Sequence, residues 1–269
     1  MSNSFLLSLS ALAALVPAAI APVGRAPSGE TRGMIYWALI AVAVAGPVAW
    51  VAVQQGQSWH TGVGAALWLA IAVTMVLFAG VAAVNAVARR LTPLLLAYLF
   101  VLGVLATLWL NEPARPLTGL APPGWLQVHI LVSVVAYGLL TLAAVAGAAV
   151  VIQQHALKAK RPTGFTRQLP AVAEGEDLQG HLLVASEVVL GVALLSGAVL
   201  SWQETGTPLQ VDHKTVLSFA TFAVIAVLLW LHHRQGLSGR RTARYVLTAY
   251  LLLTLAYPGV KFVTDVLMA

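Results

Sequence analysis

The chain has 269 residues, of which 59% are hydrophobic and only 9% are charged. Soluble globular domains carry about 45–50% apolar and about 25% charged residues, and so few charges could not cover the surface of a soluble protein of this length. The composition therefore excludes a soluble enzyme, a nucleic-acid-binding domain and a disordered chain. It predicts a membrane protein built of helices, because the apolar runs are long and unbroken, whereas a barrel would show alternating segments of about 10 residues.

Eight apolar segments reach the roughly 17–25 residues that a membrane-spanning helix needs. They cover residues 5–23, 34–53, 63–88, 91–110, 125–151, 178–202, 216–232 and 245–268. We therefore expect an all-α, polytopic bundle of about eight transmembrane helices. Within this continuous bundle, residues 1–123 are expected to form a four-helix scaffold, and residues 124–269 are expected to carry the function.

Positively charged residues divide unevenly between the two sides of the predicted bundle. Twelve of the 15 lysines and arginines fall in alternate connections, starting after the first helix; they are Arg25, Arg32, Arg89, Arg90, Lys158, Lys160, Arg161, Arg167, Arg234, Arg240, Arg241 and Arg244. Because cytoplasmic loops collect positive charge, this pattern places those connections in the cytoplasm and both termini outside. The net charge of +6 then reports orientation and contact with anionic lipid, not binding of nucleic acid.

Two segments need separate interpretation. The first span is expected to be an uncleaved helix, because its basic residues follow the apolar run and a signal peptide has them before it. Residues 153–180 form the longest connection, which joins a basic cluster to two prolines and an acidic run. This composition predicts a solvated cytoplasmic linker.

Histidine is the natural candidate for chemistry in this chain. There is no cysteine, which excludes disulfides, thiolate metal sites and covalent haem attachment to this chain, whereas a neutral imidazole is a good ligand for haem iron. His129 lies one turn inside the predicted outer end of the fifth helix, four residues after Trp125, and Ser133 and Tyr137 continue its stripe. This pattern fits either an interfacial polar stripe or a ligand.

Two further histidines lie at the opposite, cytoplasmic boundary. His181 opens the sixth predicted helix and His232 closes the seventh, so the two side chains lie at matched depth on antiparallel helices. They could bind one haem iron from two sides, or they could be unrelated interfacial residues. His60, His155 and His213 fall in loops or at helix exits, where solvated side chains are expected.

Ionisable residues within a span are costly and are functional candidates by default. Glu187 is the clearest, two turns inside the sixth helix from His181, where it could orient a histidine, carry protons or meet a partner. Lys261 and Asp265, four residues apart in the last span, are expected to pair with each other. Asn85 is the main candidate for a buried polar residue in the first four helices.

Two stretches of the sequence resemble the cytochrome c assembly family (CcsA/CcmC type). The first runs from Trp125-Leu126-Gln127-Val128-His129-Ile130 through Ala136-Tyr137-Gly138. The second runs from Lys214-Thr215-Val216-Leu217-Ser218 through Leu231-His232, Gly236 and Gly239-Arg240-Arg241 to Leu255-Ala256-Tyr257-Pro258-Gly259-Val260. The likeness covers the chain from about Trp125 to its end, and the eight-span size looks most like the short inner-membrane YpjD/HemX branch.

The resemblance implies a haem-binding, non-enzymatic, multi-pass protein of the bacterial inner membrane that handles haem b for cytochrome c assembly. Its partners would be membrane lipid, other assembly proteins or an apocytochrome. A histidine at the position of His129 serves the family as an outside haem ligand, and one at the position of His232 as a ligand to haem within the membrane. His181 resembles a feature of the short branch, and either His181 or a partner chain would supply the other side of the iron.

The sequence departs from the full family pattern on the outer side. The connection after the sixth helix, about Gln203 to His213, has no tryptophan cluster, and no second outside histidine follows the last signature. Two readings without this haem role therefore stay open. One is a haem-free membrane transporter or partner subunit that uses Glu187. The other is an electron-transfer subunit with paired histidines, which reduction by a quinol would favour.

Overall fold

The computed structural model describes residues 3–20, 30–55, 62–110, 123–207, 212–235 and 240–263, and every regular element in these ranges is helical. In chain order they are α1 (Asn3–Ile20), α2 (Glu30–Gln55), α3 (Val63–Val84), α4 (Ala86–Arg89), α5 (Thr92–Leu108), α6 (Pro123–Lys158), α7 (Val172–Thr205), α8 (His213–Gln235), α9 (Arg240–Thr254), the π-helical turn η1 (Leu255–Gly259) and α10 (Val260–Phe262).

The prediction of a helical membrane bundle is confirmed. As far as the described residues reach, each of the eight expected apolar spans coincides with a helix or, for 63–88 and 245–268, with consecutive helical elements. Among the described residues, five helices are long and apolar enough to cross a membrane, while α1 and α5 are shorter apolar helices. Large apolar side chains such as Val101, Leu195 and Val227 lie exposed on the surface, as lipid contact requires.

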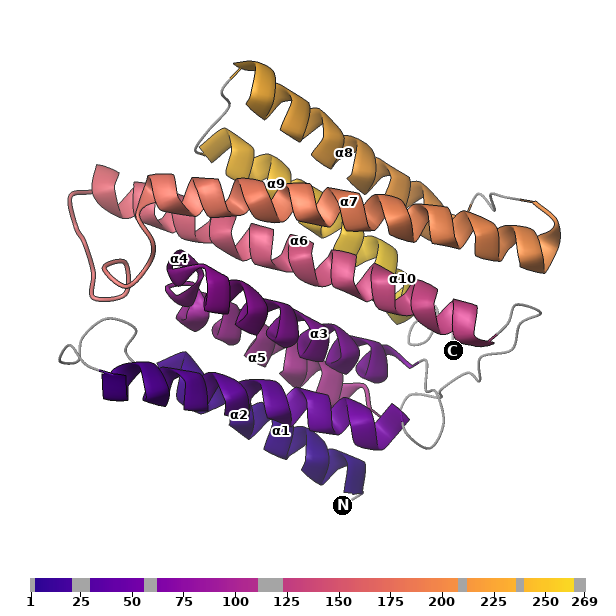
Figure 1. Ribbon diagram of the computed structural model, residues 1–269, viewed down its shortest axis with the longest axis horizontal. Helices are drawn as coiled ribbons and strands as arrows, with labels where there is room; N and C mark the ends of the chain where they lie inside the picture. Colours follow the sequence, from indigo (N-terminus) through magenta and orange to yellow (C-terminus); the bar gives the residue numbers. More distant parts are fainter. Residues whose placement is uncertain are drawn as a thin grey trace.

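The helices pack in successive layers, as Figure 1 shows. The pair α1 and α2 forms one side of the bundle, α3 and α5 lie next to it, α6 follows, and α7, α8 and α9 form the other side. The two central helices, α3 and α6, contact each other and are the most buried of the apolar helices. Gly138 permits this contact, because a Cβ atom there would lie 2.8 Å from Leu77 Cδ1.

The antiparallel hairpin of α6 and α7 is the most extensive helix pair in the structure. Small residues bring the two backbones together along its length: a Cβ on Gly147 would lie 2.5 Å from the Gln179 side chain, and one on Gly175 would lie 2.8 Å from Val150. In each pair, the two residues lie at nearly equal distances along the chain from residue 163, which is the centre of the hairpin. This register determines which residues of α7 face the outer half of α6.

The connection inside this hairpin is shorter than the sequence predicted. Helix α6 continues to Lys158 and α7 begins at Val172, so only residues 159–171 join them. The expected linker is wrong in extent because its apolar residues continue the helix interface: Leu169 and Leu178 are buried. An ion pair between Arg90 and Glu174, 3.7 Å apart, also fixes the start of α7.

The expectation of a buried polar residue at Asn85 is also corrected. Asn85 is only half-buried and lies where α3 ends, so the third helix stops at Val84 instead of reaching residue 88. Its side-chain oxygen accepts a hydrogen bond from the backbone N–H of Val87 at 2.9 Å. Asn85 therefore caps the short helix α4, a common role for asparagine.

Candidate functional site

A cavity of about 300 Å³ lies among α6, α7, α8, the end of α9 and η1. It is found near the end of the bundle where α6 begins and α7 ends, which is the predicted outer end (Figure 1). The volume is at the lower limit of the range usual for small-molecule sites. Of the three histidines predicted as ligands, only His129 lines it.

The imidazole of His129 is held by a chain of hydrogen bonds. Its Nδ1 atom lies 2.8 Å from the hydroxyl oxygen of Ser196 on α7, and that hydroxyl donates to the carbonyl of Ala193 at 2.8 Å. Since the proton of Ser196 is used for Ala193, the oxygen of Ser196 accepts, and Nδ1 must carry the donated proton. The network assigns this tautomer, which leaves the Nε2 lone pair of the neutral ring available to a ligand.

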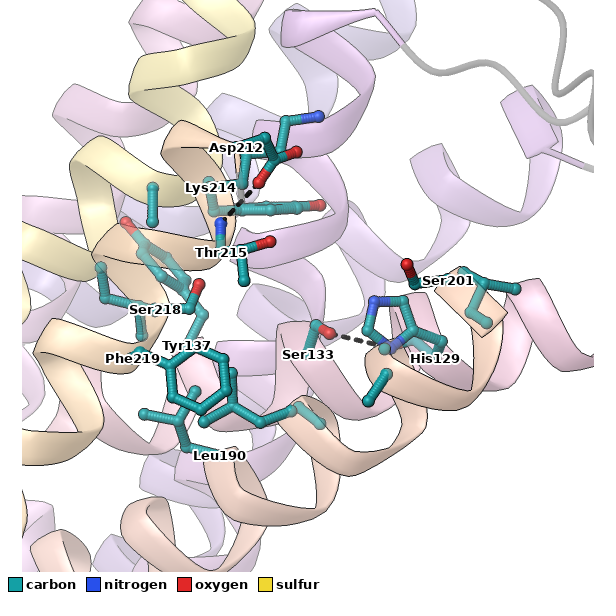
Figure 2. A pocket seen from close by; sticks show the side chains of 18 residues that line it. His129, Ser133, Tyr137, Leu190, Ser201, Asp212, Lys214, Thr215, Ser218 and Phe219 are labelled. Carbon is teal, nitrogen blue, oxygen red and sulfur yellow. Dashed lines mark hydrogen bonds between the residues drawn. The ribbon is translucent and has the colours of Figure 1, made fainter. Parts of the chain in front are cut away.

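Helix α7 carries no side chain where the ring of His129 rests. A Cβ atom on Gly197 would lie 3.0 Å from Cε1 of His129, closer than side chains normally approach. Figure 2 shows the ring across the cavity from Thr215 and Ser218, with Ser133 one turn further along α6 and hydrogen-bonded to the His129 carbonyl at 2.8 Å. Ser196 and Gly197 together fix the position of the imidazole.

Four tyrosines lie at and behind the inner wall of the cavity. Tyr137 and Tyr257 line it, with ring centroids 6.0 Å apart. The Tyr137 hydroxyl lies 3.1 Å from that of Tyr250 and 3.5 Å from that of Tyr98, and the hydroxyls of Tyr98 and Tyr250 are also hydrogen-bonded to each other. The hydroxyls of Tyr98, Tyr137 and Tyr250 therefore all find partners, and these three side chains join α5, α6 and α9.

Asp212 and Lys214 lie at the start of α8 and line the same cavity. The Asp212 carboxylate accepts a hydrogen bond from the backbone N–H of Thr215 at 2.8 Å. Partial burial by itself would raise the pKa of Asp212, but the hydrogen bonds from Thr215 and the positive charge of Lys214 together hold that pKa below its usual value. Asp212 is therefore an anion that caps the helix.

The two histidines of the opposite boundary do not line this cavity. The His181 side chain is 76% exposed, and its Nδ1 lies 3.0 Å from the backbone oxygen of Asp177, one turn back on its own helix. His232 is also exposed. In Figure 1 the final turns of α8 diverge from the first turns of α7. The described part of the chain shows no shared pocket for the two rings, and their joint ligation of one haem stays a prediction.

Some of the remaining candidate residues lie within the described residues and others lie outside them. His155 and His213 are exposed, as expected, while His60, the side chain of Lys261 and the whole of Asp265 lie outside the described residues. Both carboxylate oxygens of Glu187 are buried, and neither has a hydrogen-bond partner in the described ranges. In those ranges, no cluster of three or more His, Asp or Glu residues suited to a metal ion is found.

Comparison with known proteins places this chain in a family. The model of the family described as cytochrome C assembly protein matches residues 34–268. The chain belongs to the cytochrome c assembly protein family. The match begins in α2, so it extends well beyond the region from Trp125 onward that the sequence resemblance covered.

Relatives within the cytochrome c assembly protein family agree with the expected branch. An uncharacterized 28.8 kDa protein of Azospirillum brasilense is 51% identical over 270 residues and matches along the full length of both chains. Inner membrane protein YpjD of Escherichia coli is 30% identical over 66% of this chain and 65% of its own. Protein HemX of Brevibacillus brevis is 22% identical over 60% of this chain and 59% of its own. The predicted multi-pass inner-membrane localisation is confirmed.

Proposed function

We propose that this chain binds haem b in the cavity at His129 and holds or passes it at the outer side of the inner membrane during cytochrome c assembly. The observation that carries the proposal is the Nε2 atom of His129, left available in a cavity whose inner wall is aromatic and aliphatic. The charged residues that line the cavity, Asp212 and Lys214, lie at the start of α8, where Asp212 caps the helix. Membership of the cytochrome c assembly protein family supports the same role.

The residues present fit a haem better than a bare metal ion. A metal ion held by protein alone needs three or four protein ligands, and no such cluster is found in the described ranges. The porphyrin of a haem supplies four ligands to its iron, so one histidine from the protein is enough. Gly197 leaves the imidazole room to rest against α7, and Leu190, Tyr137 and Tyr257 offer the apolar contacts that a porphyrin needs.

Each residue has a separate task in this proposal. His129 binds the iron, and Ser196 holds the proton on Nδ1 so that Nε2 faces the ligand. Tyr137 and Tyr257 form the wall behind the ligand, and their packing keeps water from it. No residue is asked to make or break a covalent bond, so the chain acts as a carrier, with an assembly protein or an apocytochrome as the receiver.

The test is a haem titration of the purified full chain in detergent. We expect an intense haem absorption band, shifted from that of haem in detergent alone, which saturates at about one haem per chain. A chain that leaves the haem spectrum unchanged at every protein concentration would contradict the proposal. The inward site stays a separate prediction: saturation at a second haem per chain that is lost in His232→Ala would support it, and saturation at one haem that His232→Ala leaves unchanged would contradict it.

Replacement of Ser196 by alanine should weaken haem binding without unfolding the protein. The variant loses the acceptor that fixes the Nδ1 proton of His129, and loss of such a supporting hydrogen bond to a ligating histidine costs about 10- to 100-fold in affinity. The dissociation constant from the same titration measures the effect. Ser186→Ala, a change of the same kind at a serine of α7 that bonds to the carbonyl of Leu183 and does not line the cavity, should leave the constant within about twofold. Equal affinities for the Ser196 variant and the wild type would mean that the hydrogen bond has no such role.

The second candidate function is a haem-free transporter or partner subunit, and one observation favours it. Both oxygens of Glu187 are buried without a hydrogen-bond partner in the described residues, and such groups within a span often carry protons or meet a partner. Under this alternative Glu187→Gln should abolish function in cells, while a variant of His129 should be tolerated. The carrier proposal predicts the reverse order, measured as the cellular content of cytochrome c.

A further inference from the structure

The cavity changes from polar to apolar along its depth. On α7, Ser201 lies toward the outer end and Leu190 three turns deeper. On α8, Thr215 lies in the first turn and Phe219 one turn deeper. The same order holds on α6, where His129 precedes Tyr137 by two turns. Because three helices give the same gradient, the cavity suits a ligand with an apolar body and one polar edge.

The positive charge at the polar end is Lys214. It lines the cavity and is exposed, and the ion pairs of the described residues, Arg90 with Glu174 and His181 with Asp177, do not involve it. Asp212 is near enough for the charge of Lys214 to help lower its pKa, but its carboxylate caps α8 through the backbone N–H of Thr215 and forms no ion pair with Lys214 among the described residues. The ammonium group of Lys214 can therefore also reach an anionic ligand at the opening of the cavity.

We propose that Lys214 pairs with the carboxylates on one edge of a planar apolar ligand, so that this edge lies at the opening of the cavity and the ring lies deeper. The inference rests on the proposed function, since haem is such a ligand. Carboxylates are costly to bury in an apolar region, and the gradient leaves the opening as the place where they keep water and gain a cation. Lys214 would thus select ligands with an acidic edge and fix which way round they bind.

The test compares haem with its dimethyl ester, in which both carboxylates are masked and the ring is unchanged. Dissociation constants are measured on the detergent-solubilised full chain by absorbance and by quenching of tryptophan fluorescence. For the wild type we expect haem to bind about two- to fivefold more tightly than the ester, which is the range for an exposed ion pair. The preference should shrink as salt is added, because salt screens exposed charges.

Three variants test whether Lys214 pairs with the carboxylates of the ligand. Lys214→Met should bind haem and ester equally, Lys214→Arg should keep the preference, and Lys158→Met, at the opposite end of α6, should behave as the wild type. If haem binds through His129 but Lys214→Met keeps the full preference for haem over its ester, the role of Lys214 is wrong while the proposed function stands. If neither compound binds the wild-type chain, the proposed function itself fails.

Discussion

A chain with His129 replaced by glycine should lose its haem absorption band and regain it when imidazole is added. Among the described residues, the substitution removes the only histidine that lines the cavity, but it leaves the space that the ring occupied between α6 and α7. Supporting residues of a ligating histidine are worth about 10- to 100-fold in affinity, and the ligand itself should be worth more. We therefore expect the affinity for haem to fall by more than about 100-fold.

Imidazole separates a lost ligand from a damaged fold. A small molecule that enters the vacated space can supply the missing nitrogen, and Ser196 on α7 is still present to accept its N–H. Absorbance titration with haem, with and without imidazole, measures the recovery. His155→Gly is the matched control, since it removes an exposed histidine from the same helix. Undiminished haem binding by the His129 variant would exclude this residue as the ligand.

The bundle could be predicted from the sequence because lipid imposes a simple rule. Backbone groups within a bilayer must be paired inside their own segment, so every long apolar run becomes a helix. All eight predicted spans accordingly coincide with helical segments. Helix ends were less accurate where polar residues stay helical: α7 begins at Val172, six residues before the predicted start, because Gly175 and Leu178 still pack against the bundle.

The partners of His129 could not be predicted, because they depend on the register of the hairpin. His129 and Gly197 lie symmetrically about residue 163, as do Gly147 and Gln179. With the centre of the connection known, Ser196 and Gly197 would follow directly from the position of His129. Because the sequence pattern predicts a linker over residues 153–180, it does not give the register between the two helices that this segment joins. The tyrosine cluster was missed for a related reason, since its members come from helices far apart in the chain.

The depth of a residue was easier to predict than the direction in which it points. His181 and His232 lie toward the same side of the bundle, as expected, but His181 lies nine residues inside α7 instead of opening it, and it is turned outward and bonded to its own helix. Hydropathy gives the position of a side chain along a span, whereas its direction depends on which neighbours pack on each helix face. Here α9 packs against both α6 and α8, and α8 diverges from α7 (Figure 1).

Replacement of Gly197 by leucine should abolish haem binding while the helix bundle stays folded. Even the first added carbon would lie 3.0 Å from Cε1 of His129, so the imidazole must move, and the rest of the leucine side chain would enter the cavity. Glycine is about 0.8–1.0 kcal/mol less favourable than alanine inside a helix, and leucine ranks just below alanine, so the gain in helix propensity offsets part of the roughly 1–3 kcal/mol cost of overpacking. Stability measured by thermal unfolding in detergent should therefore change little, and the haem titration should show no saturable binding.

A graded series makes this result specific to the position of the ring. Gly197→Ala adds only the one carbon, which the ring can avoid by a shift of a few tenths of an ångström, so we expect weaker binding with unchanged or slightly higher stability. Gly180→Leu, on the same helix, meets no atom within 4 Å of its Cβ and should bind haem as the wild type does. Binding and stability then move independently along the series, which a general loss of packing could not produce. Wild-type affinity in Gly197→Leu would mean that haem does not bind against this face of α7.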